Sequence, residues 1–277
     1  MTDLDLKEEQ KVLSDKGYQM ERLLGKGAFS NVFLIRSLWQ NFLERPLACK
    51  VSNRTDLALR EAALLQRIDH PLFPEFYGMW QQDEKVYLLM EYVCGSSLEE
   101  FLQRRGAFSP ARTAQVGMAL AEGLRFLHQM PDFVLYRDLK PANVMIRQDG
   151  RVKLLDLGCA WQKSDQETTL AGTPGYAAPE QLTAGDKLTF ACDVYSLGKT
   201  MEAMAGKNCR GELKQVILAC TGQQPEHRIP DMQGVMAALT PLCGEDTVKN
   251  SYVRQGGFLR SRTACIKNIW ESSYKNF

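Results

Sequence analysis

The sequence predicts an α+β protein in which a small β-rich lobe precedes a larger, mainly helical lobe. Residues 18–91 hold apolar and β-branched runs separated by turn residues, a pattern typical of antiparallel strands. After Gly95 the pattern changes to helical periodicity, most clearly over residues 109–129. We therefore expect the two lobes to meet near residues 91–95.

Three strand runs and one helix are expected in the first lobe. The runs NVFLI, PLACKV and KVYLLMEYV are broken by turn residues, as in an antiparallel sheet. Between the second and third runs, residues 57–68 place four apolar side chains on one helical face: Leu57, Leu64, Leu65 and Ile68. Because Pro71 cannot continue a helix, this helix should end at His70-Pro71.

The second lobe is expected to be built around one long helix. Residues 109–129 are amphipathic, with Ser109 placed as the N-cap and Pro110 at the first helical position. Two short strand runs follow, VMI and VKLL. Helical periodicity then returns over residues 191–205, 211–221 and 231–239.

Composition excludes several classes of protein. The chain has 277 residues, 44% hydrophobic and 24% charged, as in ordinary globular domains. Its net charge of +1 argues against a nucleic-acid footprint over the surface, so no nucleic-acid partner is expected. No apolar run approaches the ~20 residues that span a bilayer, and the charged N-terminus lacks the apolar centre of a secretory signal. The eight cysteines include no CxxC pair, so we expect reduced thiols in a cytoplasmic protein.

Three segments are expected along the chain. Residues 1–17 form an N-terminal extension, residues 18–243 the two lobes (18–93 and 94–243), and residues 244–277 a tail. From Thr247 to Phe277 the tail has six lysines and arginines against one acid, together with five aromatic residues. Such a tail either binds an anionic surface or nucleic acid, or stays solvated, or packs its aromatics on its own domain.

A glycine-bearing turn between two strand runs is the first candidate site. In the run GKGAFS, residues 25–30, glycines let backbone N–H groups approach phosphate oxygens without an intervening side chain. The same residues also fit a simple hairpin turn.

A lysine and a glutamate form the second candidate site. Lys50 lies in the strand run PLACKV, eleven residues before Glu61 in the expected helix. A lysine that faces the interior needs a counter-charge, which Glu61 can supply while Lys50 holds phosphates. The alternative is a pair of solvated surface charges.

Two further runs carry acids and an amide. In YRDLKPAN, residues 136–143, Asp138 can accept a hydroxyl proton and Lys140 can neutralise phosphoryl charge. Asn143, in the same run, can ligate a metal. After VKLL, the run Asp156-Leu157-Gly158 places a carboxylate at a strand end, which is a hard oxygen ligand suited to magnesium.

In this order and spacing, the motifs resemble those of the protein kinase family over about residues 18–240. Ala178-Pro179-Glu180 matches a further family motif, and so does the stretch that begins at Asp193. Arg228 stands where family members carry the arginine that pairs with that motif's glutamate, here Glu180. The resemblance implies the bilobal protein kinase fold, with one main helix in the N-lobe.

The resemblance also implies an activity: the transfer of the γ-phosphoryl group of ATP to protein hydroxyls. The metal cofactor implied is Mg²⁺, with Mn²⁺ as an alternative. Lys50 and Glu61 would pair and hold the α- and β-phosphates. Asp138 would deprotonate the hydroxyl, and Lys140 would contact the γ-phosphate. Asn143 and Asp156 would ligate the metal. The residues implied to contact the nucleotide are Gly25, Lys26, Gly27, Ala28, Phe29, Ser30, Val32, Ala48, Lys50, Met90, Glu91, Val93 and Met145.

The acceptor class follows from the same resemblance. Lys140, together with Thr173 in the run GTPGY, is similar to the serine/threonine branch, so the expected partners are protein substrates with Ser/Thr acceptors. One alternative is a pseudokinase that acts as an interaction module, although the sequence contains Lys50, Glu61, Asp138, Asn143 and Asp156. Another is a small-molecule kinase, although such relatives generally lack the GTPG and APE runs.

Four positions bear on regulation or depart from the family pattern. Thr168 and Thr169 are candidates for autophosphorylation, which in relatives orders the loop through the arginine preceding the catalytic aspartate; unmodified loop hydroxyls are the alternative. Tyr136 replaces the usual histidine and keeps its bulk. Cys159, next to the expected metal site, is either an oxidation-sensitive thiol or a packed one.

Overall fold

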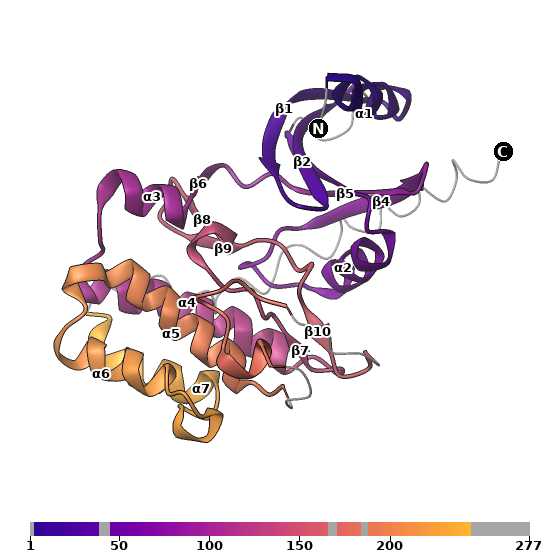
Figure 1. Ribbon diagram of the computed structural model, residues 1–277. Helices are drawn as coiled ribbons and strands as arrows, with labels where there is room; N and C mark the ends of the chain where they lie inside the picture. Colours follow the sequence, from indigo (N-terminus) through magenta and orange to yellow (C-terminus); the bar gives the residue numbers. More distant parts are fainter. Residues whose placement is uncertain (1–2, 39–44, 166–170, 184–187, 245–277) are drawn as a thin grey trace. The chain divides into compact units, whose positions relative to one another are not determined.

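Strands gather in the first part of the chain and helices in the second, so the fold is α+β, as the sequence predicts (Figure 1). The computed structural model describes residues 3–38, 45–165, 171–183 and 188–244. The chain divides into two units, Met1–Cys243 and Gly244–Phe277, and every described helix and strand belongs to the first. Among the described residues, no helix is both long enough and apolar enough to cross a membrane.

The N-lobe is a five-stranded antiparallel sheet in the order β1-β2-β3-β5-β4. Its strands are β1 (Tyr18–Lys26), β2 (Ser30–Ser37), β3 (Leu47–Ser52), β4 (Phe76–Gln82) and β5 (Lys85–Glu91). The three strand runs expected from the sequence are β2, β3 and β5. All three are central because each is rich in β-branched and aliphatic residues that pack on both faces.

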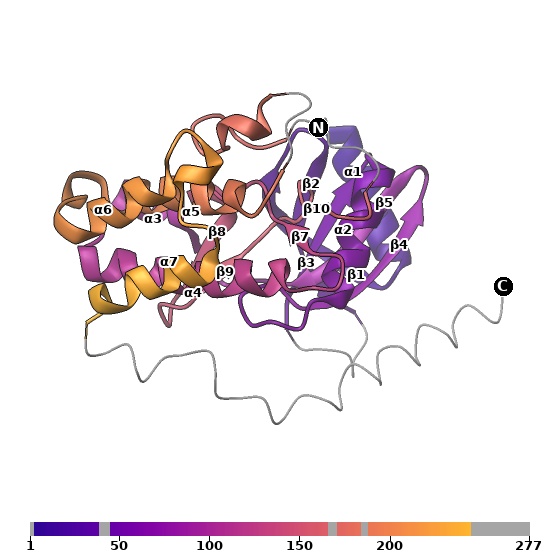
Figure 2. The same cartoon turned by 90° about the horizontal axis from the view of Figure 1, so that it is seen from below.

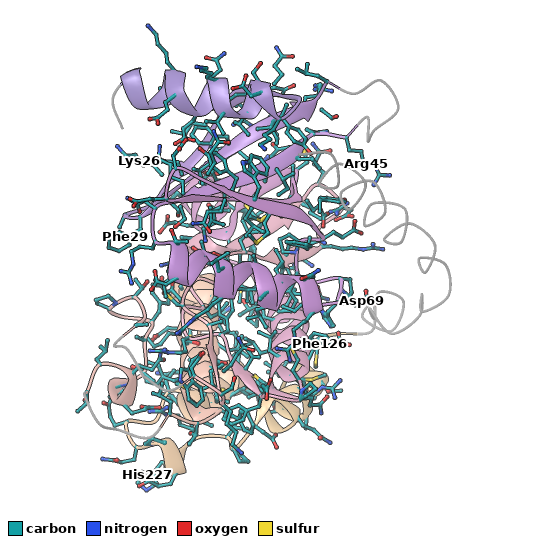
Figure 3. All side chains as sticks on the ribbon, turned by 90° about the vertical axis from the view of Figure 1, so that its right-hand side faces the viewer. Lys26, Phe29, Arg45, Asp69, Phe126 and His227 are labelled. Carbon is teal, nitrogen blue, oxygen red and sulfur yellow. The ribbon has the colours of Figure 1, made fainter. Side chains whose placement is uncertain are left out.

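One helix lies on each face of this sheet, α1 (Asp3–Asp15) on one side and α2 (Thr55–Arg67) on the other (Figure 3). Successive strand residues point to opposite faces. Tyr87 of β5 therefore points toward α1, where its hydroxyl reaches Glu9, whereas Lys50 of β3 points toward Glu61 of α2. The helix expected over residues 57–68 is thus confirmed as α2.

Helix α1 has no counterpart in the sequence-based prediction. It buries Val12 and Leu13 against the sheet, together with the carboxylate of Glu9. Oε2 of Glu9 accepts a 2.7 Å hydrogen bond from the Tyr87 hydroxyl, and Oε1 accepts one of 2.7 Å from Lys85 Nζ. Tyr87 in turn stacks on Trp80, with ring centroids 4.8 Å apart. The extension is therefore a packed part of the N-lobe.

We expect Glu9→Ala to lower the free energy of unfolding by about 1–3 kcal/mol, because it leaves the buried Tyr87 hydroxyl without a hydrogen-bond acceptor. The matched control is Glu8→Ala, since Glu8 is 56% exposed and lies 3.5 Å from Lys85. That exposed pair should contribute less than about 1 kcal/mol. Urea denaturation checks both, and equal losses would contradict the role given to the buried network.

The C-lobe contains five α-helices within the described residues: α3 (Leu98–Arg105), α4 (Pro110–His128), α5 (Ala191–Ala205), α6 (Gly211–Cys220) and α7 (Met232–Leu239). Ser109 caps α4 by accepting a hydrogen bond from the Arg112 amide, as its position before Pro110 predicts. Figure 2 shows α7 alongside α4 and α6 alongside α5. Four of these helices match the expected ranges, and α3 is the addition.

Two small sheets of short strands hold the segment between α4 and α5, one of them together with β6 from before α3. β6 (Gly95–Ser97), β8 (Val144–Arg147) and β9 (Val152–Leu154) form one small sheet. β7 (Val134–Leu135) and β10 (Trp161–Gln162) form another. The β8–β9 hairpin is extended by a backbone hydrogen bond of 2.8 Å from Leu155 N to Asn143 O. Asn143 and Asp156, which are far apart in the sequence, are thereby brought to the same end of the hairpin.

The two lobes share one hydrophobic core. Leu65 of α2, Leu157 and Tyr136 belong to a single buried cluster, and Phe76 packs against it. Tyr136 is fully buried and donates a hydrogen bond to the carbonyl of Leu155. The substitution of tyrosine for the family's histidine therefore keeps an apolar contact between the lobes.

Candidate active site

Lys50 joins the N-lobe to the C-lobe. Its Nζ donates to both carboxylate oxygens of Glu61, at 2.9 and 2.7 Å, and to Oδ1 of Asp156 at 2.7 Å. The side chains of Lys50 and Glu61 are 10% and 6% exposed, whereas that of Asp156 is 49% exposed. A Cβ placed on Gly158 would lie 3.0 Å from Asp156 Oδ1, so glycine is the residue that leaves room for this group.

Charge attraction keeps Lys50 and Asp156 ionised. Burial alone would lower the pKa of Lys50, but the carboxylates of Glu61 and Asp156 outweigh it and raise that pKa. Burial likewise opposes ionisation of Asp156, yet Lys50 lowers the pKa of this carboxyl. The half-exposed carboxylate of Asp156 is therefore charged at neutral pH and faces solvent on its other side.

A second cluster forms around Asp138. Oδ2 of Asp138 accepts hydrogen bonds from Lys140 Nζ at 2.8 Å and from Asn143 Nδ2 at 3.0 Å. Oδ1 accepts one of 2.7 Å from the hydroxyl of Thr173, to which Lys140 Nζ also donates at 2.6 Å. Asp138 is thus held in one orientation by three groups, each of which acts on its side-chain oxygens.

The backbone at both aspartates is unusual. Arg137, just before Asp138, has φ +70°, and Asp156 has φ +62°. Left-handed backbone in residues other than glycine is sparsely populated and persists where the surroundings enforce it. At Arg137 the enforcing group is the fully buried Asp193 of α5, which accepts from the amides of Tyr136 and Arg137 at 2.9 and 2.8 Å.

The residues expected to contact a nucleotide lie on one face of the N-lobe sheet. Val32 pairs with Lys50 across β2 and β3, and Ala48 pairs with Met90 across β3 and β5. Directly opposite residues in an antiparallel pair share a face, and Ala48 and Lys50 are two apart on β3. Val32, Ala48, Lys50 and Met90 therefore line the same side of the sheet, the side that faces α2 and the C-lobe.

The glycine-bearing turn connects β1 to β2. Gly27 N donates to Ser30 O at 2.7 Å, which closes the turn, and Phe29 at its tip is 57% exposed. Gly25 and Lys26 still belong to β1 and pair with Val32 and Asn31. The hairpin that the sequence allowed is therefore present, and its tip lies beside the end of β3, where Phe29 O accepts hydrogen bonds from Asn53 N and the Ser52 hydroxyl.

The oxygen donors near Asp156 suit a hard cation. Asn143 uses its Nδ2 on Asp138, both on Oδ2 and on the main-chain oxygen at 2.9 Å, which leaves its Oδ1 as an acceptor. The carboxylate of Asp156 is half-exposed and offers a second oxygen donor. Carboxylate and amide oxygens, completed by waters and phosphates, are the donor set that Mg²⁺ prefers. The residues present therefore fit this metal.

The remaining residues of the prediction are placed as follows. Glu91, at the end of β5, directs its carboxylate to Lys153 Nζ at 2.5 Å, and its amide donates to Glu75 O at 2.9 Å, so its side chain and its amide are both engaged. Val93 is buried directly after β5, and Met145 is half-buried on β8. Thr168 and Thr169 lie outside the described residues. The tail residues 245–277 also lie outside them.

Two contacts of the candidate site were not predicted from the sequence. Thr173 bridges Asp138 and Lys140, although the sequence identified it only as a marker of the acceptor class. Gln181 donates to the Arg137 carbonyl at 2.9 Å and accepts from Ala178 N, so it ties the APE run to the catalytic run. Neither contact has a periodic or charge signature, because each joins segments more than thirty residues apart in the sequence.

The pairing expected between Glu180 and Arg228 is present. Arg228 donates to both Glu180 oxygens, at 2.6 and 2.9 Å, and its side chain is fully buried. The guanidinium also donates to three main-chain carbonyls, those of Ala191, Gly222 and Gln223. Every N–H of this buried cation therefore has an acceptor.

Cys159 behaves as a packed thiol in this environment. Burial, and then the carboxylates of Asp138 and Asp156, raise the pKa of Cys159 to about 11. The nucleophilic thiolate is therefore scarce at neutral pH. Of the two interpretations of this cysteine, the structure favours the unreactive one.

We expect iodoacetamide at pH 7 to modify the exposed Cys94 well before Cys159. The rate at Cys159 should rise about tenfold for each pH unit below its pKa, because the thiolate fraction rises by that factor. Mass mapping of cysteine peptides after timed alkylation measures both rates. A Cys159 rate that matches Cys94 at pH 7, or that does not depend on pH, would contradict this assignment.

Together, the two lobes and the Lys50 and Asp138 clusters define a site of the phosphoryl-transfer class. The statistical model of the protein kinase domain matches residues 18–229, well over half of the chain. The chain therefore belongs to the protein kinase family.

Relatives of the chain are named protein kinases and come from organisms far apart. The chain is 34% identical over 215 residues to serine/threonine-protein kinase PknB of Mycobacterium tuberculosis, a match covering 70% of this chain and 33% of PknB. It is 31% identical over 183 residues to cAMP-dependent protein kinase catalytic subunit PRKX of Homo sapiens, covering 63% of this chain and 50% of PRKX. The chain thus spans about half the length, or less, of these relatives.

Proposed function

We propose that this protein is a serine/threonine protein kinase that transfers the γ-phosphoryl group of ATP, with magnesium, to hydroxyls of protein substrates. One observation carries the proposal: Lys50 contacts Glu61 and Asp156 together, within 2.9 Å. This contact aligns a phosphate-binding cation with a metal-binding carboxylate across the two lobes. The name of the relative PknB, a serine/threonine-protein kinase, supports the class of acceptor.

The nucleotide would lie between the sheet and β8. Val32 and Ala48 would cover one side of the adenine, and Met145 the other, with Met90 at the back. Main-chain groups of Glu91 and Val93 would hydrogen-bond to the adenine edge. The turn from Gly25 to Ser30, which includes Lys26, Ala28 and Phe29, would cover the phosphates with backbone N–H groups.

Lys50 would hold the α- and β-phosphates. Its second carboxylate partner, Glu61, keeps the ammonium in place, because a buried lysine needs a counter-charge to stay protonated. Asn143 and Asp156 would hold the metal, either Mg²⁺ or Mn²⁺. When bound, the metal neutralises phosphate charge and orients the transferred group.

Asp138 would orient and deprotonate the acceptor hydroxyl. Its oxygens are fixed by Thr173, Lys140 and Asn143, so a substrate hydroxyl meets a positioned acceptor. Lys140, which already lies 2.8 Å from Asp138, would contact the γ-phosphate and stabilise charge on it. The proton leaves the hydroxyl for Asp138 as the hydroxyl oxygen bonds to phosphorus and the bond to the leaving diphosphate breaks.

Regulation and location are part of the proposal. A phosphate on Thr168 or Thr169 would add negative charge near Arg137 and order the segment between Asp156 and Glu180. The described residues include seven cysteines and none is in a disulfide, which supports the cytoplasmic location that we propose.

Lys50→Met tests the observation that carries the proposal. We expect it to lower kcat/KM for ATP by about 10²–10³-fold, because it removes a fixed charge from the phosphates. The measurement is steady-state phosphorylation of a generic basic protein with varied MgATP, with EDTA as the metal control. The matched variant is Lys85→Met, which removes an N-lobe lysine that instead pairs with Glu9. Equal rates for Lys50→Met and wild type would contradict the assignment.

A further inference from the structure

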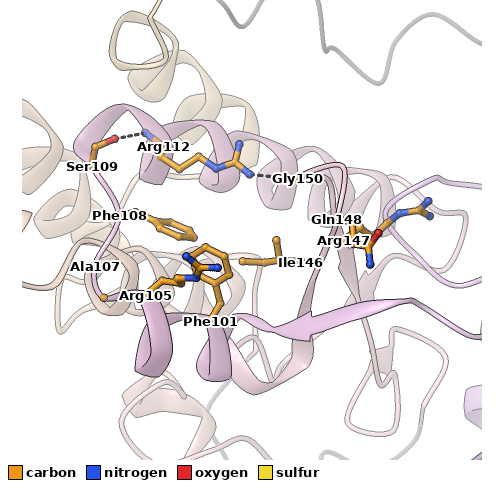
Figure 4. A pocket seen from close by; sticks show the side chains of 11 residues that line it. Phe101, Arg105, Ala107, Phe108, Ser109, Arg112, Ile146, Arg147, Gln148 and Gly150 are labelled. Carbon is orange, nitrogen blue, oxygen red and sulfur yellow. Dashed lines mark hydrogen bonds between the residues drawn. The ribbon is translucent and has the colours of Figure 1, made fainter.

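A cavity of about 460 Å³ lies in the C-lobe, where α3 ends, α4 begins and the β8–β9 hairpin turns (Figure 4). Its lining includes none of the residues assigned to nucleotide, metal or catalysis. The lining residues are Phe101, Arg105, Gly106, Ala107, Phe108, Ser109, Arg112, Ile146, Arg147, Gln148 and Gly150.

The inner wall of the cavity is apolar. Phe101 and Phe108 meet edge to face, with ring centroids 5.3 Å apart, and Ile146 of β8 lies across from them (Figure 4). Such a wall accepts a bulky apolar side chain, because burying it against aromatic surface is favourable. A purely ionic ligand would leave this wall exposed.

Three arginines surround the apolar wall. Arg112 is fixed by a 2.6 Å hydrogen bond to Gly150 O, and Arg147 lies 3.5 Å from both Glu91 and Asp149. Arg105, in the last turn of α3, is exposed. No ion pair or side-chain hydrogen bond of Arg105 is found within the part of the chain that the structure describes. The rim therefore offers a cation that is available to a ligand.

Positive charge predominates around the cavity, although Glu91 and Asp149 lie near Arg147. Residues 101–112 contain three arginines and no acid, and residues 146–151 contain two arginines and one aspartate. A positive rim around an apolar wall is complementary to an anionic segment that carries an apolar side chain. The chain's own residues 247–277 have the wrong charge for this role, with six lysines and arginines against one acid.

We propose that this cavity is a docking site for an acidic segment of a protein substrate, one that inserts a bulky apolar side chain between Phe101, Phe108 and Ile146. The proposal rests on the kinase function proposed above. Ile146 is three residues from Asn143 in extended chain, a span of ~10 Å. A docked substrate therefore has its acceptor segment at a high effective concentration near Asp138.

Direct binding tests the site without any turnover. The probe is a short fluorescein-labelled peptide of glutamates around a Leu-Phe pair, and its counterpart has lysine at each glutamate. We expect the glutamate peptide to bind and the lysine peptide not to bind. Arg105→Glu should weaken binding by about tenfold, since it replaces an attraction by a repulsion. Arg104→Glu, on the neighbouring exposed arginine that does not line the cavity, should change it by less than about twofold.

A second position makes the test independent of Arg105. Gln148 is exposed and lines the cavity, so Gln148→Lys should tighten binding of the glutamate peptide and Gln148→Glu should weaken it. In phosphorylation assays, Arg105→Glu should raise KM for a substrate carrying the acidic segment and leave kcat unchanged. It should also leave unchanged the rate on a substrate without that segment.

Three outcomes would overturn the docking site. In the first, neither Arg105→Glu nor Gln148→Glu weakens binding of the glutamate peptide. In the second, the lysine peptide binds as tightly as the glutamate peptide. In the third, inorganic phosphate alone displaces the glutamate peptide. The last would assign the cavity to a small anion. Failure of binding in a protein that still phosphorylates substrates removes only the docking site. Failure of phosphorylation with intact binding removes the kinase function and, with it, the identification of the bound segment as a substrate.

Discussion

Asp138→Asn is expected to lower kcat by about 10³-fold, within the range by which positioned general bases accelerate reactions. Asparagine keeps the shape of the side chain and can still accept a hydrogen bond from Thr173, which lies 2.7 Å away. It cannot, however, take up the proton of an acceptor hydroxyl. The loss should therefore appear in the chemical step and not in the fold.

Nucleotide affinity separates this expectation from simple misfolding. Lys50, Glu61 and Asp156 do not contact Asp138, so the affinity for MgATP should stay within about twofold of wild type. Single-turnover rates and nucleotide binding by titration calorimetry measure the two quantities. Asp56→Asn, at a surface aspartate whose side chain is 60% exposed, should leave both unchanged. A variant Asp138→Asn with unaltered kcat would remove Asp138 from the mechanism.

Glu180→Ala is expected to lower the free energy of unfolding by about 3–5 kcal/mol, because it leaves a buried cation without its counter-charge. Arg228 has no exposed side-chain surface, and both of its bonds to Glu180 are shorter than 3.0 Å. Its ring neighbour Tyr195, 4.9 Å away, cannot replace a carboxylate.

The matched control is an exposed ion pair. Arg36 and Glu21 lie 2.7 Å apart with side chains 51% and 30% exposed, so Glu21→Ala should cost less than about 1 kcal/mol. Urea denaturation followed by tryptophan fluorescence gives both values. Similar losses for Glu180→Ala and Glu21→Ala would show that the buried pair does not anchor the C-lobe.

The long elements could be predicted because local signals agree with packing. Helix α4 has Ser109 as its cap, Pro110 at its start and an apolar stripe that becomes the centre of the C-lobe. Strand β3 is buried at every residue, and four of its six residues are apolar, the exceptions being Lys50 and Ser52. Such elements can be predicted from their own residues, without knowing which segments pack against them.

The two missed helices are polar, and one of them is also short. Helix α1 has few apolar residues, and its position depends on Glu9 reaching Tyr87, a contact across 78 residues that no local pattern reveals. Helix α3 carried usable signals, since Ser97 caps it and Gly106, with φ +81°, ends it. Its eight residues are too few for the apolar period to stand out.

In the candidate site, too, some contacts could be predicted from the sequence and others could not. The sequence indicated that Lys50 needs Glu61, because a buried lysine requires a counter-charge. The contact of Lys50 with Asp156 spans 106 residues, and it becomes visible only when the hairpin of β8 and β9 meets the N-lobe. The bridge that Thr173 makes to Asp138 spans 35 residues and follows from tertiary packing alone.

The most direct test of the central claim is transfer of label from ATP to a protein hydroxyl. Wild-type protein, magnesium and a generic protein substrate are incubated in parallel with ATP labelled at the γ- or at the α-phosphate. We predict label on the substrate from γ-labelled ATP only, recovered as phosphoserine or phosphothreonine, and none with Lys50→Met. Bound MgATP with no transfer of the γ-label, or label found only on tyrosine, would contradict it.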